Sequence, residues 1–221
     1  MPFFTLGKDD LKFPPAHFAD ADGLLAEGGD ITADWLLEGY KSGAFLWAGP
    51  MDTLKWYSPD PRVVMFCERL DLPKYLKDFL DFAPYTVTYS EDFEKGLAFC
   101  ESIENEKPMY PGWITGVFAQ AYKELNERGY VRSAQVWKEG KMIGAAFGSK
   151  IGHLFFMEHV CENDDYAGEL ALKSLVELLA KEEVSLIDMH RDTTETIDIG
   201  LSEISKSEYL HILRKFMADY K

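Results

Sequence analysis

Residues 133–160 read SAQVWKEGKMIGAAFGSKIGHLFFMEHV, and the expected architecture rests on this stretch. It holds three runs rich in β-branched, aromatic and small apolar residues: Ser133–Trp137, Met142–Ser149 and Leu154–Val160. Short segments with a glycine, Lys138–Gly140 and Lys150–Gly152, separate the runs, and glycine supplies the backbone conformations that tight hairpins require. The stretch therefore predicts an antiparallel meander of three strands.

Regular patterns continue on both sides of the meander. Before it, strands are expected at Val63–Cys67 and Tyr85–Tyr89, and helices at Leu72–Phe82, Asp92–Ile103 and Gly116–Arg128. After it come a helix at Tyr166–Lys181, a strand at Ser185–Met189 and a last helix that opens with the capping box Ser205–Glu208 and runs towards Ala218. This order predicts an α+β class with a mixed sheet, and it resembles the N-acetyltransferase-like (GNAT) fold.

The segment before Val63 has a different composition. Prolines and glycines punctuate it, from Pro14-Pro15 to Ser58-Pro59-Asp60-Pro61, and one short helix is expected at Ala33–Lys41 with Thr32 as its N-cap. Residues 1–62 are therefore expected to form a small loop-rich domain, and residues 63–221 a larger GNAT-like catalytic domain.

Composition limits the class of protein. The three cysteines, Cys67, Cys100 and Cys161, are odd in number and form no CxxC pair, so neither a disulfide scaffold nor structural zinc is expected. The N-terminus lacks the pattern of a signal peptide, and no apolar run approaches the roughly 18 residues that a spanning helix needs. We expect a cytoplasmic protein in a reducing setting, without a membrane segment.

Charge restricts the partners. The formal net charge is −15, and both parts of the chain are acidic. Nucleic-acid binding needs lysines and arginines that displace counterions from phosphates, so net charge alone disfavours such a partner. Any tRNA surface must then be a local basic patch, with Lys74 and Lys77, or Lys138, Lys141 and Lys150, as the candidates.

Four stretches carry a resemblance to a known family. They are GLLAEGGD (23–30), YKSGAFLW (40–47), WYSPDPR (56–62) and WIT (113–115), and the match continues through 144–148, 154–158 and 186–188. In order and spacing they resemble the leucyl/phenylalanyl-tRNA–protein transferases. The resemblance implies transfer of leucine, phenylalanine or methionine from aminoacyl-tRNA to proteins that begin with Arg or Lys, without a cofactor or a metal.

The same resemblance implies roles for several residues. Trp47 and Trp113, both beside glycines in loops, would hold the 3′-terminal adenosine of the tRNA by stacking. Glu158 and Asp188 each place a carboxylate in an apolar strand, which is costly unless the group is paired or functional. Glu158 is expected to help order the nucleophile and the tRNA end, and Asp188 to help deprotonate or orient the incoming ammonium. The alternative is that both are satisfied structural carboxylates.

The chain departs from the family around this centre. Position 190 holds a histidine where the family has glutamine, so His190 either keeps the hydrogen bonding or acts as a general base; a plain loop histidine is the alternative. Residues 162–169 are acidic where the family is partly basic. The expected aminoacyl pocket contains Ala146, at a position that can hold methionine, with Phe155, Phe156 and Leu170, although these residues are equally typical of a core.

Other functions remain open at this point. The departures favour, as an alternative, a divergent member with another aminoacyl donor or weak use of tRNA. A non-catalytic binder of basic protein N-termini would also keep Glu158 and Asp188. A coenzyme-A-dependent acetyltransferase is disfavoured, because the glycine-rich motif that binds pyrophosphate is absent before the 166–181 helix, which instead begins with acidic residues.

Overall fold

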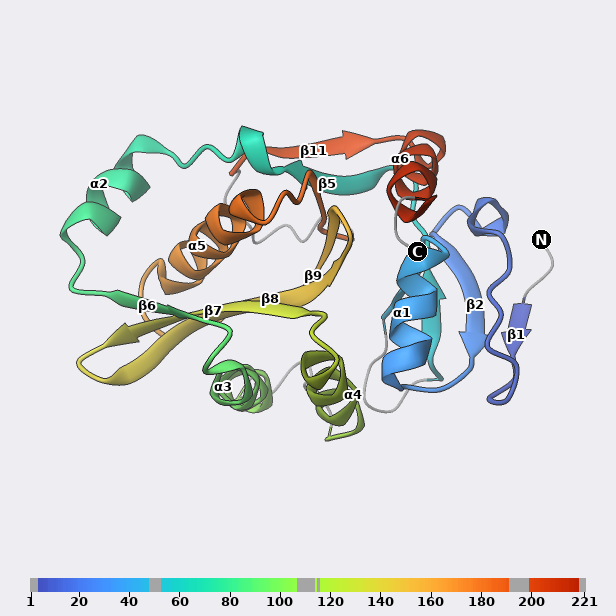
Figure 1. Cartoon of the computed structure of the whole chain (residues 1–221), viewed down its shortest axis with the longest axis horizontal. Helices are drawn as coiled ribbons and strands as arrows, with labels where there is room; N and C mark the ends of the chain where they lie inside the picture. The colour runs from blue at the N-terminus through green and yellow to red at the C-terminus, as the bar shows by residue number, and fades with distance from the viewer. Residues whose placement is uncertain (1–3, 48–52, 107–113, 115, 191–198, 219–221) are drawn as a thin grey trace.

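The computed structural model describes residues 4–47, 53–106, 114, 116–190 and 199–218. Within them the chain forms two β-sheets surrounded by helices (Figure 1). The first sheet uses strands that precede Arg62, and the second uses strands from Arg62 onward. The expected α+β class with a mixed sheet is confirmed.

The first sheet has the strand order β1-β2-β4-β3. Its strands are β1 (Phe4–Leu6), β2 (Leu24–Gly28), β3 (Phe45–Leu46) and β4 (Lys55–Tyr57). The sequence predicted a loop-rich segment with one helix, and this prediction missed the sheet. The reason is local: strands of two to five residues are too short to show an alternating pattern, and glycines lie close to the ends of several of them.

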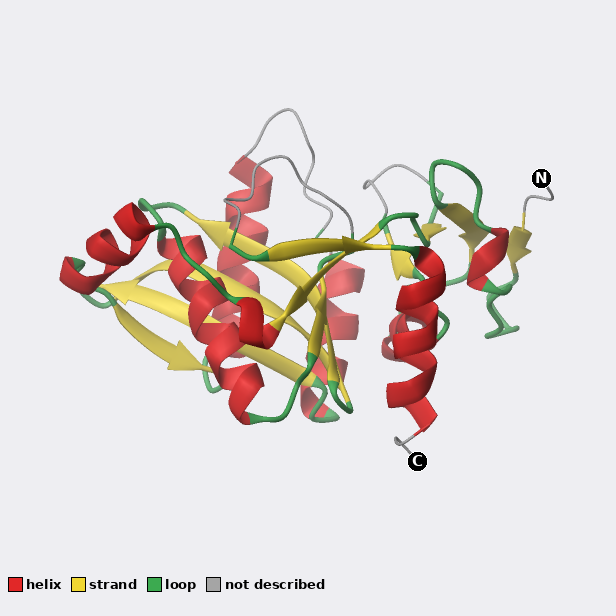
Figure 2. Cartoon of the chain, turned by 90° about the horizontal axis from the view of Figure 1, so that it is seen from above, coloured by secondary structure: helices red, strands yellow, loops and turns green. Residues whose placement is uncertain are grey.

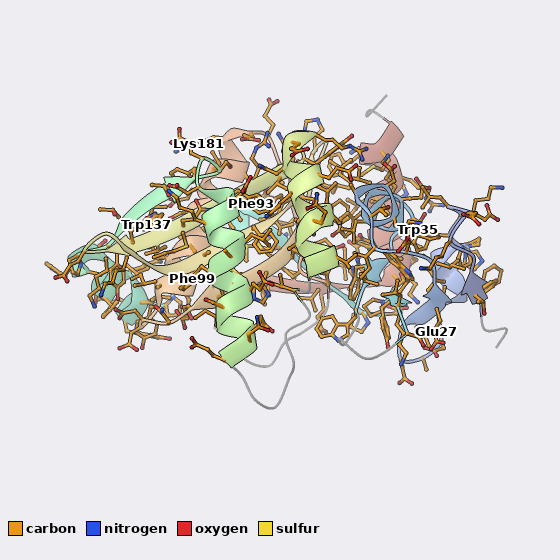
Figure 3. All side chains as sticks on the ribbon, turned by 90° about the horizontal axis from the view of Figure 1, so that it is seen from below. Glu27, Trp35, Phe93, Phe99, Trp137 and Lys181 are labelled. Atoms are coloured by element: carbon orange, nitrogen blue, oxygen red, sulfur yellow. A yellow bond between two sulfur atoms is a disulfide. The ribbon has the colours of Figure 1, made fainter. Side chains whose placement is uncertain are left out.

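Helix α1 (Ala33–Lys41) covers this sheet, as Figure 1 shows. It begins where predicted, because the Thr32 hydroxyl accepts a hydrogen bond from the backbone N–H of Trp35. Trp35 packs near Trp56 and Phe13 and is labelled in Figure 3. The opposite end of α1 carries Tyr40, which is 1% exposed and points towards the second sheet.

The second sheet has the order β11-β5-β10-β9-β8-β7-β6. Its strands are β5 (Arg62–Phe66), β6 (Thr86–Tyr89), β7 (Val131–Lys138), β8 (Lys141–Ile151), β9 (Leu154–Glu162), β10 (Leu186–Asp188) and β11 (Leu201–Ile204). The predicted meander is confirmed as β7–β8–β9, paired antiparallel. Strand β10 lies between β9, to which it is parallel, and β5, to which it is antiparallel. The edge strand β11 was not predicted from the sequence.

Helices cover both faces of this sheet (Figures 1 and 2). Helices α3 (Phe93–Glu106) and α4 (Gly116–Glu127) lie on one face and α5 (Ala167–Lys181) on the other, while α2 (Lys74–Phe82) and α6 (Lys206–Ala218) lie at the ends. All five correspond to predicted helices, with ends shifted by a few residues. Each face therefore has its own apolar cluster, one of which continues into the first sheet.

One prediction about the cysteines was wrong. Cys100 in α3 and Cys161 in β9 are joined by a disulfide, with Cα atoms 5.8 Å apart. They are 61 residues apart in sequence, and only the packing of α3 on β9 brings them together. In the part of the chain that the structure describes, no helix has the length and apolar character needed to cross a bilayer.

Candidate active site

The site lies where two parallel strands separate. Strands β9 and β10 are paired up to Asp188 opposite Phe156, where β10 ends while β9 continues. The pairing of β9 with β8 shifts at the same level, which makes Glu158 the extra residue of a β-bulge. The separation leaves Glu158, Asp188 and His190 beside one another at the carboxyl ends of the strands, a place where open sheets bind ligands.

Two tyrosines hold Glu158. The hydroxyls of Tyr40 from α1 and Tyr122 from α4 both donate to Oε2 of Glu158 at 2.5 Å, and the two hydroxyls lie 2.8 Å apart. The Glu158 side chain is 4% exposed. Burial raises the pKa of both tyrosines well above the ordinary value, and the charge of Glu158 raises it further. Both phenols therefore stay protonated and fix one oxygen of the carboxylate.

Asp188 is held by a buried arginine. Arg62 is 0% exposed and donates to both carboxylate oxygens, from Nε at 2.8 Å and from a terminal nitrogen at 2.6 Å. Tyr209 from α6 donates to the same carboxylate at 2.6 Å. Burial would raise the pKa of Asp188, but the charge of Arg62 and the hydrogen bonds outweigh burial and hold that pKa below its usual range. Asp188 is thus an anion at neutral pH, and its oxygens are already engaged in hydrogen bonds.

His190 lies between the two carboxylates. Its Nε2 is 3.9 Å from Glu158 and its Nδ1 is 3.6 Å from Asp188. Both ring nitrogens are buried, and neither has a hydrogen-bond partner among the described residues. Its backbone has a φ of +68°, a strained value for a residue with a side chain, and its N–H donates to Asp188 at 2.9 Å. The backbone conformation and this hydrogen bond together place the imidazole between Glu158 and Asp188.

The protonation of His190 follows from its surroundings. Burial by itself lowers the pKa of the imidazole, whereas Asp188 and Glu158 raise it, and the net effect is a raised pKa. The ring also stacks on Phe45, with centroids 4.4 Å apart. Because the two anions raise its pKa, His190 binds a proton more firmly than a free imidazole does, and its neutral form can accept a proton and release it again.

An aromatic path leads from this histidine to the surface. Phe45 in β3 contacts Trp47 edge to face, with centroids 6.2 Å apart. Trp47 is 45% exposed, as a stacking platform for a base requires. Trp113, the second predicted tryptophan, lies outside the described residues.

Comparison with known proteins identifies the chain. A sequence profile described as "Leucyl/phenylalanyl-tRNA protein transferase" matches residues 64–214, and the profile of the N-terminal domain of the same proteins matches residues 29–60. The chain belongs to the leucyl/phenylalanyl-tRNA–protein transferase family. It is therefore an aminoacyltransferase by descent, and the resemblance found in its motifs is confirmed.

Individual relatives cover nearly the whole chain. A leucyl/phenylalanyl-tRNA–protein transferase of Flavobacterium johnsoniae is 33% identical over 205 residues, which is 93% of this chain and 96% of that protein. The corresponding protein of Pseudomonas fluorescens is 34% identical over 215 residues, covering 96% of this chain and 94% of the relative.

Solved structures that resemble the transferase include acetyltransferases. A GCN5-related N-acetyltransferase from Kribbella flavida aligns with a TM-score of 0.45 and 12% identity, over 76% of this chain and 60% of the other. L-PGS from Bacillus licheniformis aligns with a TM-score of 0.43 and 10% identity, over 79% and 57%. These likenesses say nothing about the reaction.

The residues expected in the aminoacyl pocket lie on two faces of the sheet. Phe156 stacks on Tyr40 with centroids 4.6 Å apart, on the face that carries Glu158. Ala146 and Phe155 are fully buried on the opposite face, in the apolar cluster under α5, and Leu170 packs against that cluster. Because neighbouring residues of a strand point to opposite faces, Phe155 and Phe156 cannot line the same side.

Four residues of the site were not singled out from the sequence: Arg62, Tyr40, Tyr122 and Tyr209. Arg62 and Tyr40 lie inside two of the family motifs, at 56–62 and 40–47, so a signal for them was present. Tyr122 lies on α4 and Tyr209 on α6, each on the buried side of its helix. In the sequence, these positions look like ordinary members of an apolar helix face. Their hydroxyls gain partners only through tertiary packing.

The acidic segment at 162–169 is built into the start of α5. Glu162 accepts a hydrogen bond from the backbone N–H of Gly168, and burial raises the pKa of Glu169. Asp164 pairs with Lys138 at 2.7 Å. Two other lysines proposed for a basic patch are also paired, Lys77 with Asp71 and Lys150 with Glu182. These pairs lower the positive charge that the lysines present to a phosphate backbone.

Proposed function

We propose that this family member transfers a leucyl, phenylalanyl or methionyl group from aminoacyl-tRNA to the α-amino group of proteins that begin with Arg or Lys, in the cytoplasm. The observation that carries the proposal is the buried imidazole of His190, whose ring nitrogens lack partners between two fixed carboxylates. Aminolysis of an ester needs a proton acceptor and correct placement of the two reactants, and it needs no metal or redox group.

The chemical step can be assigned to these residues. The α-ammonium group of the acceptor first releases one proton to solvent. The neutral amine then attacks the carbonyl carbon of the aminoacyl ester, and His190 takes the second proton that the nitrogen loses. The C–O bond to the ribose then breaks, and the imidazolium returns the proton to the leaving ribose oxygen. An amide replaces the ester, and the tRNA leaves with a free hydroxyl. Glu158, held by Tyr40 and Tyr122, lies close enough to stabilise the imidazolium that forms in between.

Asp188 has a positioning role in this proposal. Its carboxylate is engaged by Arg62, Tyr209 and the backbone of His190, so it is poorly suited to take a proton from the substrate. Instead it fixes the ring and the strained backbone of His190. This assignment differs from the expectation that Asp188 itself deprotonates the acceptor.

Charge supports the preference for a basic acceptor. The chain carries a net charge of −15, and two carboxylates face the proposed reaction centre. A strongly negative field attracts a peptide with a charged α-amine and a cationic first side chain. The exposed ring of Trp47 is proposed to stack on the terminal adenosine, a contact that depends little on net charge.

The test uses the purified protein with labelled Leu-, Phe- and Met-tRNA and a peptide that begins with Lys or Arg. A peptide that begins with Gly is the control for the acceptor. We expect label on the basic peptides and little on the glycine peptide. Absence of transfer from all three tRNAs by folded protein would overturn the proposal, while equal labelling of both peptides would overturn the basic preference alone.

Two variants separate the role of His190 from packing. His190→Gln keeps a hydrogen-bonding side chain of the kind the family uses but cannot accept a proton, so we expect slower transfer and loss of the part of the pH profile that the imidazole controls. His190→Ala should lose most of the activity. His17→Gln, on an exposed histidine, is the matched control. An unchanged pH profile in His190→Gln would exclude His190 as the proton acceptor.

A further inference from the structure

A second cluster of reactive side chains includes His159, the residue that follows Glu158 in the sequence. Cys100, His159 and Cys161 each offer one ligand atom, and these atoms lie within 4.8 Å of one another. Cys100 is 0% and Cys161 6% exposed. Glu104 joins the cluster, with a carboxylate oxygen 3.3 Å from Nε2 of His159. The cluster has no part in the proposed transfer.

The geometry follows from two local periodicities. His159 and Cys161 are two residues apart on β9, so both point to the same face of the sheet. Cys100 and Glu104 are four residues apart on α3, so both lie on the same side of the helix. Helix α3 packs on that face, beside α4, with Phe99 labelled on it in Figure 3. Two side chains from β9 and two from α3 therefore meet between the strand and the helix.

The donor set is the one that zinc prefers. Structural zinc is bound tetrahedrally by thiolates and imidazoles, with carboxylate oxygen as a less frequent ligand. Zinc binds sulfur and nitrogen ligands at about 2.0–2.3 Å, so the donor atoms around one ion lie within a few ångströms of one another, as the donor atoms of this cluster do. Thiolates and imidazole together also exclude magnesium and calcium, which require oxygen.

We propose that, with both thiols reduced, Cys100, Cys161 and His159 bind a zinc-type divalent ion, with Glu104 completing the shell. The disulfide seen between the two cysteines is the competing state of the same site. A dithiol reductant converts it to two thiols and is itself oxidised to a disulfide. Binding of the ion then releases the two thiol protons to solvent, because thiolates are the ligands.

A metal ion at this site would cross-link α3 to β9, as the disulfide does. Either the ion or the disulfide joins these two elements next to the bulge that carries Glu158. The ion differs from the disulfide because it also engages His159 and Glu104, and thus fixes the last turn of α3. The site is distinct from the proposed reaction centre, whose groups are Glu158, Asp188 and His190.

The experiment uses the full chain, reduced with a phosphine and titrated with Co²⁺ under anaerobic conditions. We expect one ion per chain, a thiolate-to-cobalt band in the near ultraviolet and ligand-field bands of tetrahedral intensity. Zn²⁺ should displace cobalt and protect two of the three thiols from a thiol reagent. Absence of the thiolate band, or lack of metal uptake by protein whose two cysteines are shown to be reduced, would overturn the proposal.

Variants assign the ligands. Cys100→Ser and Cys161→Ser should abolish the thiolate band, while Cys67→Ser, on the free and half-buried cysteine, should leave it unchanged. Glu104→Gln should weaken binding, because it replaces a charged oxygen ligand by a neutral one. If the variants of the buried cysteines no longer show the circular dichroism spectrum of the folded protein, His159→Asn tests the site instead. Cobalt binding by His159→Asn that is as tight as binding by the unmodified protein would refute the assigned site.

Discussion

Replacement of Arg62 by Met tests the buried ion pair that holds the site. The variant keeps an unbranched side chain, somewhat shorter than arginine, and removes the two N–H groups that contact Asp188 at 2.8 and 2.6 Å. Asp188 is 2% exposed, so water cannot replace the lost partner. Breaking such a pair by removing one partner costs about 3–5 kcal/mol, which is a large share of the roughly 5–15 kcal/mol that stabilises a typical domain.

Two further variants provide reference values for the loss in the free energy of unfolding. Tyr209→Phe removes one hydrogen bond to the same carboxylate and should cost about 1.5–3 kcal/mol, as hydrogen bonds to charged groups do. Lys77→Met breaks a pair with Asp71 whose side chains are 52% and 81% exposed, and should cost no more than about 1 kcal/mol. The assay is urea unfolding followed by tryptophan fluorescence and circular dichroism, with the slopes compared among variants.

A second substitution and a pH series check the cause. Asp188→Asn in the Arg62→Met background removes the uncompensated charge, so it should recover part of the lost stability. Because the pKa of Asp188 is depressed in the fold, its contribution to stability is present above the ordinary value near 3.9 and is lost as pH falls below it. Arg62→Met should lose this acid-linked part. A cost for Arg62→Met below about 1 kcal/mol, or no recovery in the double variant, would refute the reasoning.

Three other outcomes are expected. Trp47→Ala should raise the KM for aminoacyl-tRNA by a factor that corresponds to about 1–3 kcal/mol of stacking, whereas Phe82→Ala, on another exposed aromatic, should not; equal effects would contradict the stacking role. Gly148→Ala would place a Cβ 2.1 Å from the Phe156 carbonyl oxygen and should cost at least about 1–3 kcal/mol in urea unfolding. Gly116→Ala, which meets nothing within 4 Å, should be neutral or stabilising, and a similar loss in both would argue against the clash. Burial lowers the pKa of His190, but Asp188 and Glu158 raise it above its ordinary value, which gives a stabilisation that is complete below about pH 6.5 and lost as pH rises through the folded-state value. His190→Gln should flatten the free energy of unfolding over that range, and an unchanged pH dependence would count against the raised pKa.

Local patterns in the sequence determined much of the second sheet and its helices. The meander β7–β8–β9 follows from alternating runs and glycine turns, and α1 and α6 begin at Thr32 and Ser205 because hydroxyl caps act within three residues. The family and its loop motifs were also evident, since their order along the chain does not depend on contacts. The carboxylates at 158 and 188 stood out because a charge in an apolar strand is costly.

Tertiary structure decided the partners of those carboxylates and the rest of the site. Arg62 meets Asp188 across 126 residues because β5 pairs with β10, and Tyr40 meets Glu158 across 118 because α1 packs against the second sheet. Cys100 and Cys161 converge only when α3 lies on β9. Local rules act over spacings of two to four residues, whereas these contacts depend on strand register and helix packing, which bring together residues that have no relation along the chain.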